Sequence, residues 1–151
     1  MKRILITGVS GFIGSALFKS FNSKSISDVF GLCRSDSSLS IFNRNEQERI
    51  FRIDDSHSEL IKTIQNLKPD ILIHTATYFH AEHSKEDIPL MVSSVQEYGN
   101  LILEGVKDRA SKVLFINTGT SWQHFEDSAN YRATCLHAAH KEAFEKIIEY
   151  Y

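Results

Sequence analysis

The sequence predicts an α/β fold in which helices cover both faces of a parallel sheet. Short apolar segments typical of strands alternate along the chain with longer segments whose apolar residues recur every three or four positions. The 151 residues suffice for one domain, and 42% hydrophobic with 24% charged residues is a composition that supports a packed core. We therefore expect one open, doubly wound domain with three layers, helix on sheet on helix.

Five apolar segments are the expected strands, and four amphipathic segments are the expected helices. The segment 70–75 is apolar almost throughout, as expected of a strand that is covered on both faces. The strands are expected at 3–7, 29–33, 51–53, 70–75 and 113–116, and the helices at 12–21, 56–67, 89–107 and 133–151. The expected buried faces comprise Phe12, Ile13, Ala16, Leu17 and Phe21 in the first helix, Leu60, Ile61, Ile64 and Leu67 in the second, Met91, Val92, Val95, Leu101, Ile102 and Val106 in the third, and Leu136, Ala139, Ala143, Phe144, Ile147, Ile148 and Tyr151 in the last.

Charge and cysteine content exclude several classes of protein. The 17 basic and 19 acidic residues leave a net charge of −2, so no cationic surface favours nucleic acid or an anionic membrane as a partner. No apolar run approaches the roughly 20 residues that a membrane-spanning helix needs. Cys33 and Cys135 lie far apart and outside any C-x-x-C spacing, which is typical of free thiols in a reducing compartment. We expect a cytoplasmic protein that binds neither nucleic acid nor membrane.

The first expected strand is followed by Gly8, Gly11 and Gly14 and then by an amphipathic segment. A strand, a glycine-rich turn and a helix N-terminus are the arrangement in which backbone N–H groups bind a pyrophosphate. Gly8 lets the chain turn off the strand, Gly11 lets the backbone approach the phosphates, and Gly14 lets the helix pack closely on the sheet. The pattern predicts a dinucleotide cofactor, and a glycine turn without a ligand is the alternative.

Arg34 and Ser35 follow the second expected strand, whose end lies beside the adenine ribose in sheets of this kind. The planar guanidinium of Arg34 matches a phosphate and Ser35 offers a hydroxyl, so the pair favours NADP(H) over NAD(H). Asp36 is acidic and keeps NAD as the alternative cofactor. A solvated Arg34 in a serine-rich loop, with no ligand, is also consistent with the sequence.

Three segments resemble the NAD-dependent epimerase/dehydratase family, whose members are extended short-chain dehydrogenases/reductases. They read Thr-Gly-Val-Ser-Gly-Phe-Ile-Gly at 7–14, Pro-Asp-Ile-Leu-Ile-His-Thr-Ala at 69–76 and Ser-Val-Gln-Glu-Tyr-Gly-Asn-Leu at 94–101, where Ser94 replaces the usual asparagine. Residues 120–124, Thr-Ser-Trp-Gln-His, are similar to bacterial nucleotide-sugar reductases of the CDP-abequose synthase type, which would imply a role in O-antigen biosynthesis. The resemblance covers the whole chain and implies a Rossmann-type sheet in the order 3-2-1-4-5.

The resemblance also implies which residues hold the cofactor and what the chain acts on. The family's cofactor half would occupy residues 1–151, its substrate domain would be absent, and the substrate would be a nucleotide sugar with a 4-keto group. A homodimer is implied through the helices at 89–107 and 133–151. The acidic position that contacts adenine in the family corresponds to Asp54 and Asp55. The implied cofactor-binding residues are Thr7, Gly8, Ser10, Gly11, Phe12, Ile13, Gly14, Arg34, Ser35, Asp54, Asp55, Thr75, Ala76 and Lys141.

The family's chemistry implies a tyrosine that transfers a proton, a lysine four residues later and a serine or threonine that binds the substrate oxygen. None of the five tyrosines has a lysine four residues later. The segment 136–144 is similar to the family's motif, with His137 in the tyrosine position and Lys141 in the lysine position. Thr118 matches the hydroxyl position, with Thr120 as the second choice, and Tyr131 is the alternative tyrosine.

Imidazole is shorter than phenol, and a nearby ammonium favours its neutral form, so we expect His137 to donate protons poorly. The sequence therefore predicts an NADP(H)-binding oxidoreductase domain with impaired catalysis. A non-catalytic dinucleotide sensor is the alternative from another class, and an interaction fragment that binds no cofactor is a third. We expect no metal site, because the candidate side chains lack a further ligand pair at zinc-like spacing; they are His74, His80, Glu82 and His83.

Overall fold

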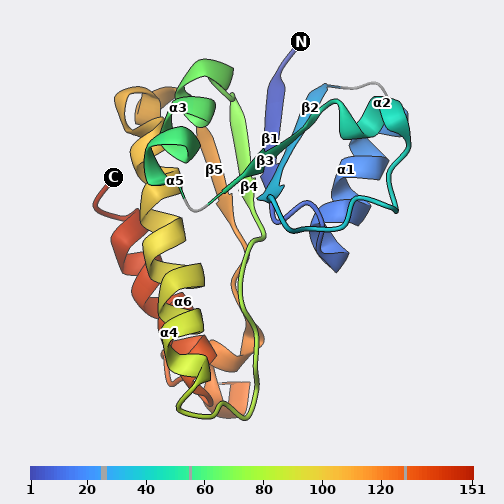
Figure 1. The fold of residues 1–151 in the computed structure, drawn as a ribbon. Coiled ribbons are helices and arrows are strands. Elements are labelled where there is room, and N and C mark those ends of the chain that lie inside the picture. Colours follow the sequence, from blue (N-terminus) through green and yellow to red (C-terminus); the bar gives the residue numbers. More distant parts are fainter. Residues whose placement is uncertain (25–26, 55, 128) are drawn as a thin grey trace. The chain divides into compact units, whose positions relative to one another are not determined.

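The computed structural model describes residues 1–24, 27–54, 56–127 and 129–151, which form two compact units (Figure 1). The sheet unit comprises Met1–Ala76 and Gly105–Thr118, and the helical unit comprises Thr77–Glu104 and Gly119–Tyr151. The predicted glycine turn therefore belongs to the sheet unit. Asp55, one of the two expected adenine-contacting residues, lies outside the described residues.

Five parallel strands form the sheet in the order β3-β2-β1-β4-β5, which confirms the predicted fold class and strand order (Figure 1). In chain order they are β1 Arg3–Thr7, β2 Asp28–Arg34, β3 Ile50–Ile53, β4 Ile71–His74 and β5 Leu114–Asn117. The central strand β1 pairs with both β2 and β4, and its last residue, Thr7, lies opposite Leu32 and His74. The carboxyl end of β1 is thus the point where the strand order reverses, at which open α/β sheets bind their ligands.

The sheet unit also contains α1 Phe12–Lys24, α2 Arg44–Gln47, α3 His57–Leu67 and the 3₁₀ helix η2 Lys107–Lys112. The helix α3 begins as predicted because the Ser56 hydroxyl accepts a hydrogen bond from the Glu59 N–H. It ends at Lys68, which adopts a left-handed φ of 52°. The short helix α2 was not predicted; its four residues are held by reciprocal hydrogen bonds between Asn43 and Glu46.

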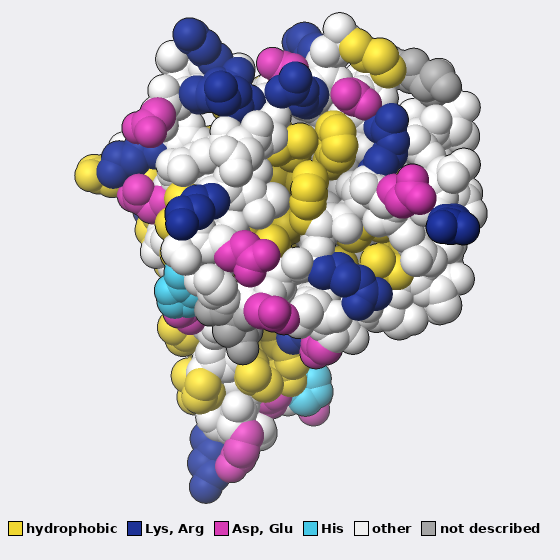
Figure 2. Space-filling model, turned by 45° about the horizontal axis from the view of Figure 1, so that its top comes forward, with side chains coloured by type: hydrophobic (Ala, Val, Ile, Leu, Met, Phe, Trp, Pro, Cys, Tyr) yellow, Lys and Arg dark blue, Asp and Glu magenta, His cyan; other side chains and the backbone are white. Residues whose placement is uncertain are grey.

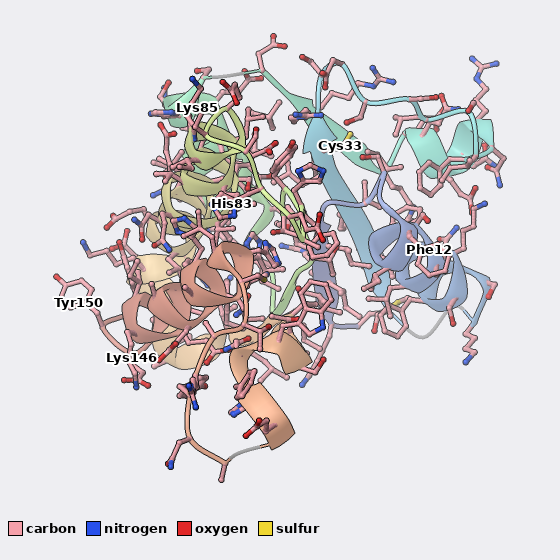
Figure 3. All side chains as sticks on the ribbon, turned by 90° about the horizontal axis from the view of Figure 1, so that it is seen from below. Phe12, Cys33, His83, Lys85, Lys146 and Tyr150 are labelled. Atoms are coloured by element: carbon pink, nitrogen blue, oxygen red, sulfur yellow. The ribbon has the colours of Figure 1, made fainter. Side chains whose placement is uncertain are left out.

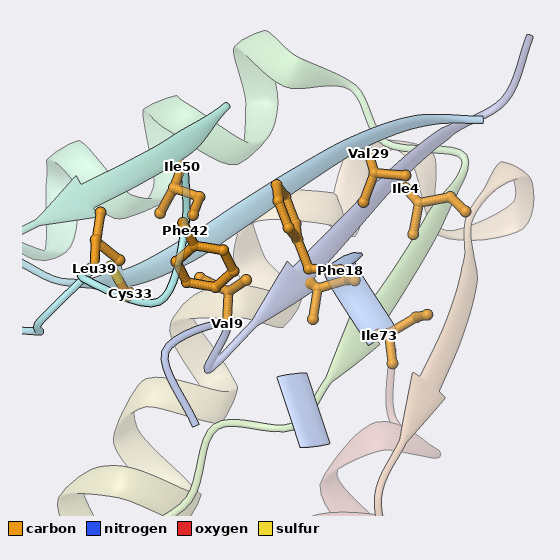
Figure 4. Close-up of a cluster of buried hydrophobic side chains, with 10 residues drawn as sticks. Ile4, Val9, Phe18, Val29, Cys33, Leu39, Phe42, Ile50 and Ile73 are labelled. Carbon is orange, nitrogen blue, oxygen red and sulfur yellow. The ribbon is translucent and has the colours of Figure 1, made fainter. Parts of the chain in front are cut away.

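The core on the α1 side of the sheet is built around Phe18, which is fully buried and packs edge-on against Phe42 at a centroid distance of 5.4 Å (Figure 4). The expectation that Phe12 and Ile13 face this core is wrong, since they are 93% and 53% exposed. The buried face of α1 instead runs through Gly14 and Phe18, four residues apart, and this leaves the first turn pointing outward. The buried cluster comprises Ile4, Ile6, Val9, Phe18, Val29, Cys33, Leu39, Phe42, Ile50 and Ile73.

The expected helix at 89–107 is a continuous run of α4 Asp87–Met91, the π-helical turn η1 Val92–Glu97 and α5 Tyr98–Val106. The helical unit also contains the 3₁₀ turns η3 Ser121–Gln123 and η4 Phe125–Asp127 and the helix α6 Leu136–Ile148. A Cβ atom on Gly99 would lie 2.3 Å from Cε2 of Phe144, so glycine is required where α5 meets α6.

The π turn changes which side chains of this run are buried. Met91 and Val95 are buried as predicted, but Val92 is 42% exposed and Leu103, which was not predicted to be buried, is 2% exposed. A π turn inserts an extra residue and so shifts the helical periodicity on which the prediction rested.

The buried face of α6 also differs from the predicted one. Phe144 is buried as expected, whereas Ala139 and Ala143 are exposed. Two polar side chains, His137 and Lys141, lie on the buried face in their place. Hydrophobic periodicity does not detect buried polar residues such as His137 and Lys141, and for this reason part of the face was assigned incorrectly.

The surface carries charges of both signs. Figure 2 shows Lys and Arg side chains interspersed with Asp and Glu around a group of hydrophobic side chains, so this face has no field of a single sign. Within the described ranges, no helix combines the length and the apolar character needed to cross a membrane.

Candidate cofactor site and active site

The turn after β1 requires glycine at two of its three glycine positions. Gly8 has a φ of 69°, and a Cβ atom there would lie 2.7 Å from the backbone of Ala76. A Cβ atom on Gly14 would lie 2.3 Å from the carbonyl oxygen of Gly8, so α1 approaches the turn as closely as its backbone allows. At Gly11, by contrast, the Gly8 carbonyl oxygen, at 3.3 Å, is the one atom of the described residues that a Cβ atom would contact. The backbone at Gly11 therefore has an open side, as a phosphate-binding turn needs.

The ends of β1 and β4 are joined by hydrogen bonds that involve threonine side chains. The Thr7 hydroxyl lies 2.7 Å from Nδ1 of His74, and both side chains are buried. The Thr75 hydroxyl donates to the backbone carbonyl of Thr7 at 2.6 Å. The Thr7 side chain is fully buried, and its hydrogen bond with His74 positions these strand ends at the predicted cofactor site.

The predicted ribose site follows β2, at the strand end marked by Cys33 in Figure 3. Nε of Arg34 lies 3.3 Å from the Asp36 carboxylate, and both side chains are exposed. The Ser35 N–H donates to the carbonyl of Ile53, which ties this loop to β3. Asp54, the described residue of the expected acidic pair, is exposed just after β3.

The two candidate hydroxyl residues lie in different units. Thr118 ends the sheet unit, where its hydroxyl donates to the His74 carbonyl at 3.0 Å. Thr120 belongs to the helical unit and caps η3, since its hydroxyl accepts from the Trp122 N–H. The Thr118 hydroxyl thus donates to the backbone and the Thr120 hydroxyl accepts from it, and Thr118 keeps its place as the first candidate through its match to the family's hydroxyl position alone.

The helical unit brings His137 and Lys141 together on the buried face of α6. The His137 side chain is 4% exposed, its ring meets Phe79 edge-on at 5.1 Å, and it is hydrogen-bonded to the backbone of Tyr78. Burial and the nearby charge of Lys141 lower the pKa of His137, and burial lowers the pKa of Lys141. His137 is therefore a neutral imidazole at pH 7, and its Nδ1 has no hydrogen-bond partner among the described residues.

Tyr131 is held away from the role of a proton donor. Its hydroxyl donates a short hydrogen bond to the Glu145 carboxylate, and its ring stacks on His124 at 5.0 Å. The carboxylate raises the pKa of Tyr131, which is opposite to the effect that the family's lysine has on its tyrosine. Gln123 also donates to Glu145, at 3.0 Å, so this carboxylate is the centre of a local network.

Sequence reasoning missed a carboxylate that organises the loop before α4. The buried Asp87 accepts hydrogen bonds from the Tyr78 hydroxyl at 2.6 Å and from both the N–H and the hydroxyl of Ser84, and its carboxylate lies 3.0 Å from Nδ1 of His80. These donors hold the pKa of Asp87 well below its usual range. His80, which the sequence offered as a metal ligand, thus contacts this carboxylate, and the described residues contain no group of three side chains that could hold a metal.

Acid is expected to weaken the Asp87 network. A carboxylate with a lowered pKa stabilises the fold above its unfolded pKa, here 3.8, and loses that contribution as the pH falls below it. We expect the melting temperature of the wild type to fall more steeply below about pH 4 than that of Asp87→Asn, which does not titrate. Circular dichroism melts over a pH series measure this, with Asp108→Asn as an exposed control; parallel curves for wild type and Asp87→Asn would contradict the assignment.

Solved structures with the same fold are numerous. Pal from Bacillus thuringiensis is 18% identical with a TM-score of 0.78, and the match covers 99% of this chain and 51% of that chain. UDP-glucose 4-epimerase from Thermus thermophilus, in complex with NAD, is 23% identical with a TM-score of 0.75, covering 99% and 50% of the two chains. UDP-glucose-4-epimerase from Stenotrophomonas maltophila, with bound NAD and formylated UDP-arabinopyranose, is 16% identical with a TM-score of 0.81, covering 99% and 48%. The chain thus spans about half the length of these proteins.

The sequence itself shows the family. No curated protein sequence matches this chain significantly. The family model described as the NAD dependent epimerase/dehydratase family matches residues 4–151, which include the glycine turn, α6 and the five strands except Arg3 at the start of β1. The chain therefore belongs to the NAD dependent epimerase/dehydratase family.

Proposed function

We propose that the chain is the NADP(H)-binding part of a nucleotide-sugar oxidoreductase. The observation that carries this proposal is the glycine turn, with its positive φ at Gly8, its open side at Gly11 and its close packing at Gly14. Residues 1–151 would be the Rossmann-type cofactor domain, and the substrate would be bound with the help of a further domain. Support for dinucleotide binding comes from the T. thermophilus enzyme, which is described in complex with NAD.

The proposed substrate is a nucleotide sugar with a 4-keto group. UDP-glucuronic acid 4-epimerase from Bacillus cereus, 22% identical, is described in complex with UDP-glucuronic acid and NAD. Residues 120–124 favour the reductases of the CDP-abequose synthase type within this class. The matching segment forms η3 and its flanks in the helical unit, where Trp122 is 40% exposed.

NADP(H) is the proposed cofactor, and NAD is the alternative. Arg34 supplies a guanidinium at the end of β2, but the nearby Asp36 carboxylate competes for it. Calorimetric titration of the chain with NADPH and with NADH tests the proposal. Saturable binding of NADPH supports it, and failure to bind either nucleotide rejects it.

Catalysis by this chain is proposed to be impaired at proton transfer. The nicotinamide would supply or accept a hydride, and the chain's own part is to bind the substrate oxygen and move a proton. Thr118 is the proposed hydroxyl for that oxygen, and Lys141 the proposed ligand of the nicotinamide ribose. His137 is neutral, buried and bound to the Tyr78 backbone, so it is a weak acid in the tyrosine position. Losing a positioned proton donor typically lowers the rate by about 10²–10⁴-fold.

The second candidate function is a dinucleotide-binding sensor without catalysis. The buried state of His137 and Lys141 favours it, because both side chains contribute to packing on α6 whether or not a reaction occurs. The two candidates differ in turnover: the impaired enzyme reduces a nucleotide 4-keto-sugar slowly with NADPH, and the sensor does not reduce it at all.

We also propose a homodimer through α4, α5 and α6. Three apolar side chains near the start of this helical run are exposed, namely Ile88, Leu90 and Val92, at 40%, 50% and 42%. Light scattering is expected to give twice the 17.2 kDa chain mass, and Leu90→Asp is expected to halve it. Leu114→Asp changes an exposed leucine of the sheet unit and is the matched control. A monomeric wild type would overturn the proposal.

A further inference from the structure

A second arginine lies beside the residues proposed to select NADP(H). Arg52 stands on β3 opposite Cys33 of β2, and its Nη1 donates to the backbone carbonyl of Ser35 at 2.7 Å. The Ser37 N–H donates to the Arg34 carbonyl at 3.1 Å, which closes a tight turn after β2. Two guanidinium groups, one from each strand, therefore flank the same turn.

The charge of Arg52 reaches the end of β2. Burial raises the pKa of the Cys33 thiol, and the positive charge of Arg52 is the largest of the effects that oppose this increase. A hydrogen bond from the Ser37 side chain acts in the same direction. The turn after β2 thus combines two cations with the hydroxyl groups of Ser35 and Ser37, which are the groups that bind a phosphate in proteins.

Asp36 is the acidic group of this turn, and its ion pair with Arg34 leaves donors for a phosphate. Its ion pair engages Nε of Arg34, and a guanidinium carries four further N–H donors. The two side chains are 79% and 72% exposed, and ion pairs that are so exposed contribute little to stability. A phosphate dianion can therefore take the place of the carboxylate without a large loss.

Arg49, on the other hand, is already committed elsewhere. Its Nη1 lies 2.8 Å from the Asp28 carboxylate at the beginning of β2, and its guanidinium covers the ring of Phe30. Among the residues that the structure describes, Arg34 and Arg52 are thus the cations at the carboxyl ends of β2 and β3.

We propose that Arg34 and Arg52 together bind the 2′-phosphate of NADP(H), with Asp36 as the counter-ion that the phosphate displaces. This inference rests on the proposed function, since it requires that the chain bind a dinucleotide. It assigns Arg52 as a specificity-determining residue, which distinguishes the phosphorylated from the unphosphorylated ribose and touches no reacting atom.

The test compares Arg52→Gln with the wild type by calorimetry. Glutamine removes the charge but keeps an N–H donor for the Ser35 carbonyl. The probes are NADPH, NADH and adenosine 2′,5′-bisphosphate, which carries the 2′-phosphate without the nicotinamide. We expect Arg52→Gln to weaken the binding of NADPH and of adenosine 2′,5′-bisphosphate about 10- to 100-fold. The affinity for NADH is expected to change by less than about twofold. Arg44→Gln removes an exposed arginine of α2 and is expected to change none of the three.

Each outcome separates the inference from the function on which it rests. If Arg34→Gln weakens the binding of NADPH and Arg52→Gln does not, the role assigned to Arg52 is overturned and the proposed function stands. Equal affinity of the wild type for NADPH and NADH overturns the two-arginine site. Binding of neither nucleotide rejects the proposed function itself. Urea denaturation of both variants establishes that any lost affinity is not lost folding.

Discussion

Replacing Gly14 by alanine is expected to abolish measurable NADPH binding and to lower the free energy of unfolding by about 1–3 kcal/mol. A Cβ atom at this position would lie 2.3 Å from the Gly8 carbonyl oxygen and 2.8 Å from the Gly8 carbonyl carbon. Both contacts are with backbone, so α1 has to move away from the turn instead of a side chain rotating. This movement separates the helix N-terminus from the turn whose N–H groups would bind the pyrophosphate.

Gly11→Ala separates the loss of binding from the loss of folding. Its Cβ atom meets the Gly8 carbonyl oxygen at 3.3 Å, so the fold is expected to tolerate it with a small shift. It would nevertheless project from the open side of the turn, where the phosphates are proposed to lie. We expect unfolding by urea to be close to wild type and NADPH binding in calorimetry to be weakened at least about tenfold. Unchanged NADPH affinity in both glycine variants would contradict the proposed position of the cofactor.

Restoring a tyrosine at position 137 is expected to increase the reduction of a nucleotide 4-keto-sugar by about 10²–10⁴-fold. The phenol of His137→Tyr would stand four residues before Lys141 on the same face of α6. The ammonium of Lys141 would then stabilise the phenolate form, as it cannot do for a neutral imidazole. The measurement is the oxidation of NADPH in the presence of the keto-sugar, for the wild type and the variant under identical conditions.

His137→Phe is the matched control for this gain. Phenylalanine has the ring of tyrosine without the hydroxyl. It therefore needs the same space beside the ring of Phe79, whose centroid lies 5.1 Å from that of His137 in the wild type. Adding Lys141→Met to His137→Tyr is expected to remove most of the gain. If the phenylalanine variant is as fast as the tyrosine variant, the missing hydroxyl is not the defect. A wild type that already reduces the sugar at ordinary enzyme rates would refute the impaired-catalysis proposal.

The positions of the strands and the glycine turn are the parts of the molecule that local sequence determines, whereas the strand order was implied by the family resemblance. Apolar runs mark the strands, and the spacing of Gly8, Gly11 and Gly14 marks the turn, because each requirement concerns a residue and its immediate neighbours. The turn's close contact with Ala76 agrees with the prediction that β4 lies beside β1. The same local logic locates α3, which was predicted from the spacing of its apolar residues.

The details that the sequence did not predict depend on contacts between distant segments. The π turn that exposes Val92 is invisible to a regular helical period. Asp87 accepts hydrogen bonds from Tyr78 and Ser84, and the path of the loop that carries these donors is seen only in the folded structure. Arg52 reads as a charged residue in a short strand, and its place beside Ser35 follows from the pairing of β2 with β3. For the same reason, the sequence showed that a histidine stands in the tyrosine position at 137, but it did not show the hydrogen bond of His137 with the Tyr78 backbone.

Titration of the unmodified chain with NADPH and NADH tests the central claim most directly, because the glycine turn, Arg34 and the family assignment all lead to dinucleotide binding. Isothermal calorimetry measures the two affinities without requiring turnover, so the state of His137 does not affect the result. We expect saturable binding of one nucleotide per chain, with NADPH bound more tightly than NADH. Absence of binding for both nucleotides, by a chain that unfolds cooperatively in urea, would contradict it.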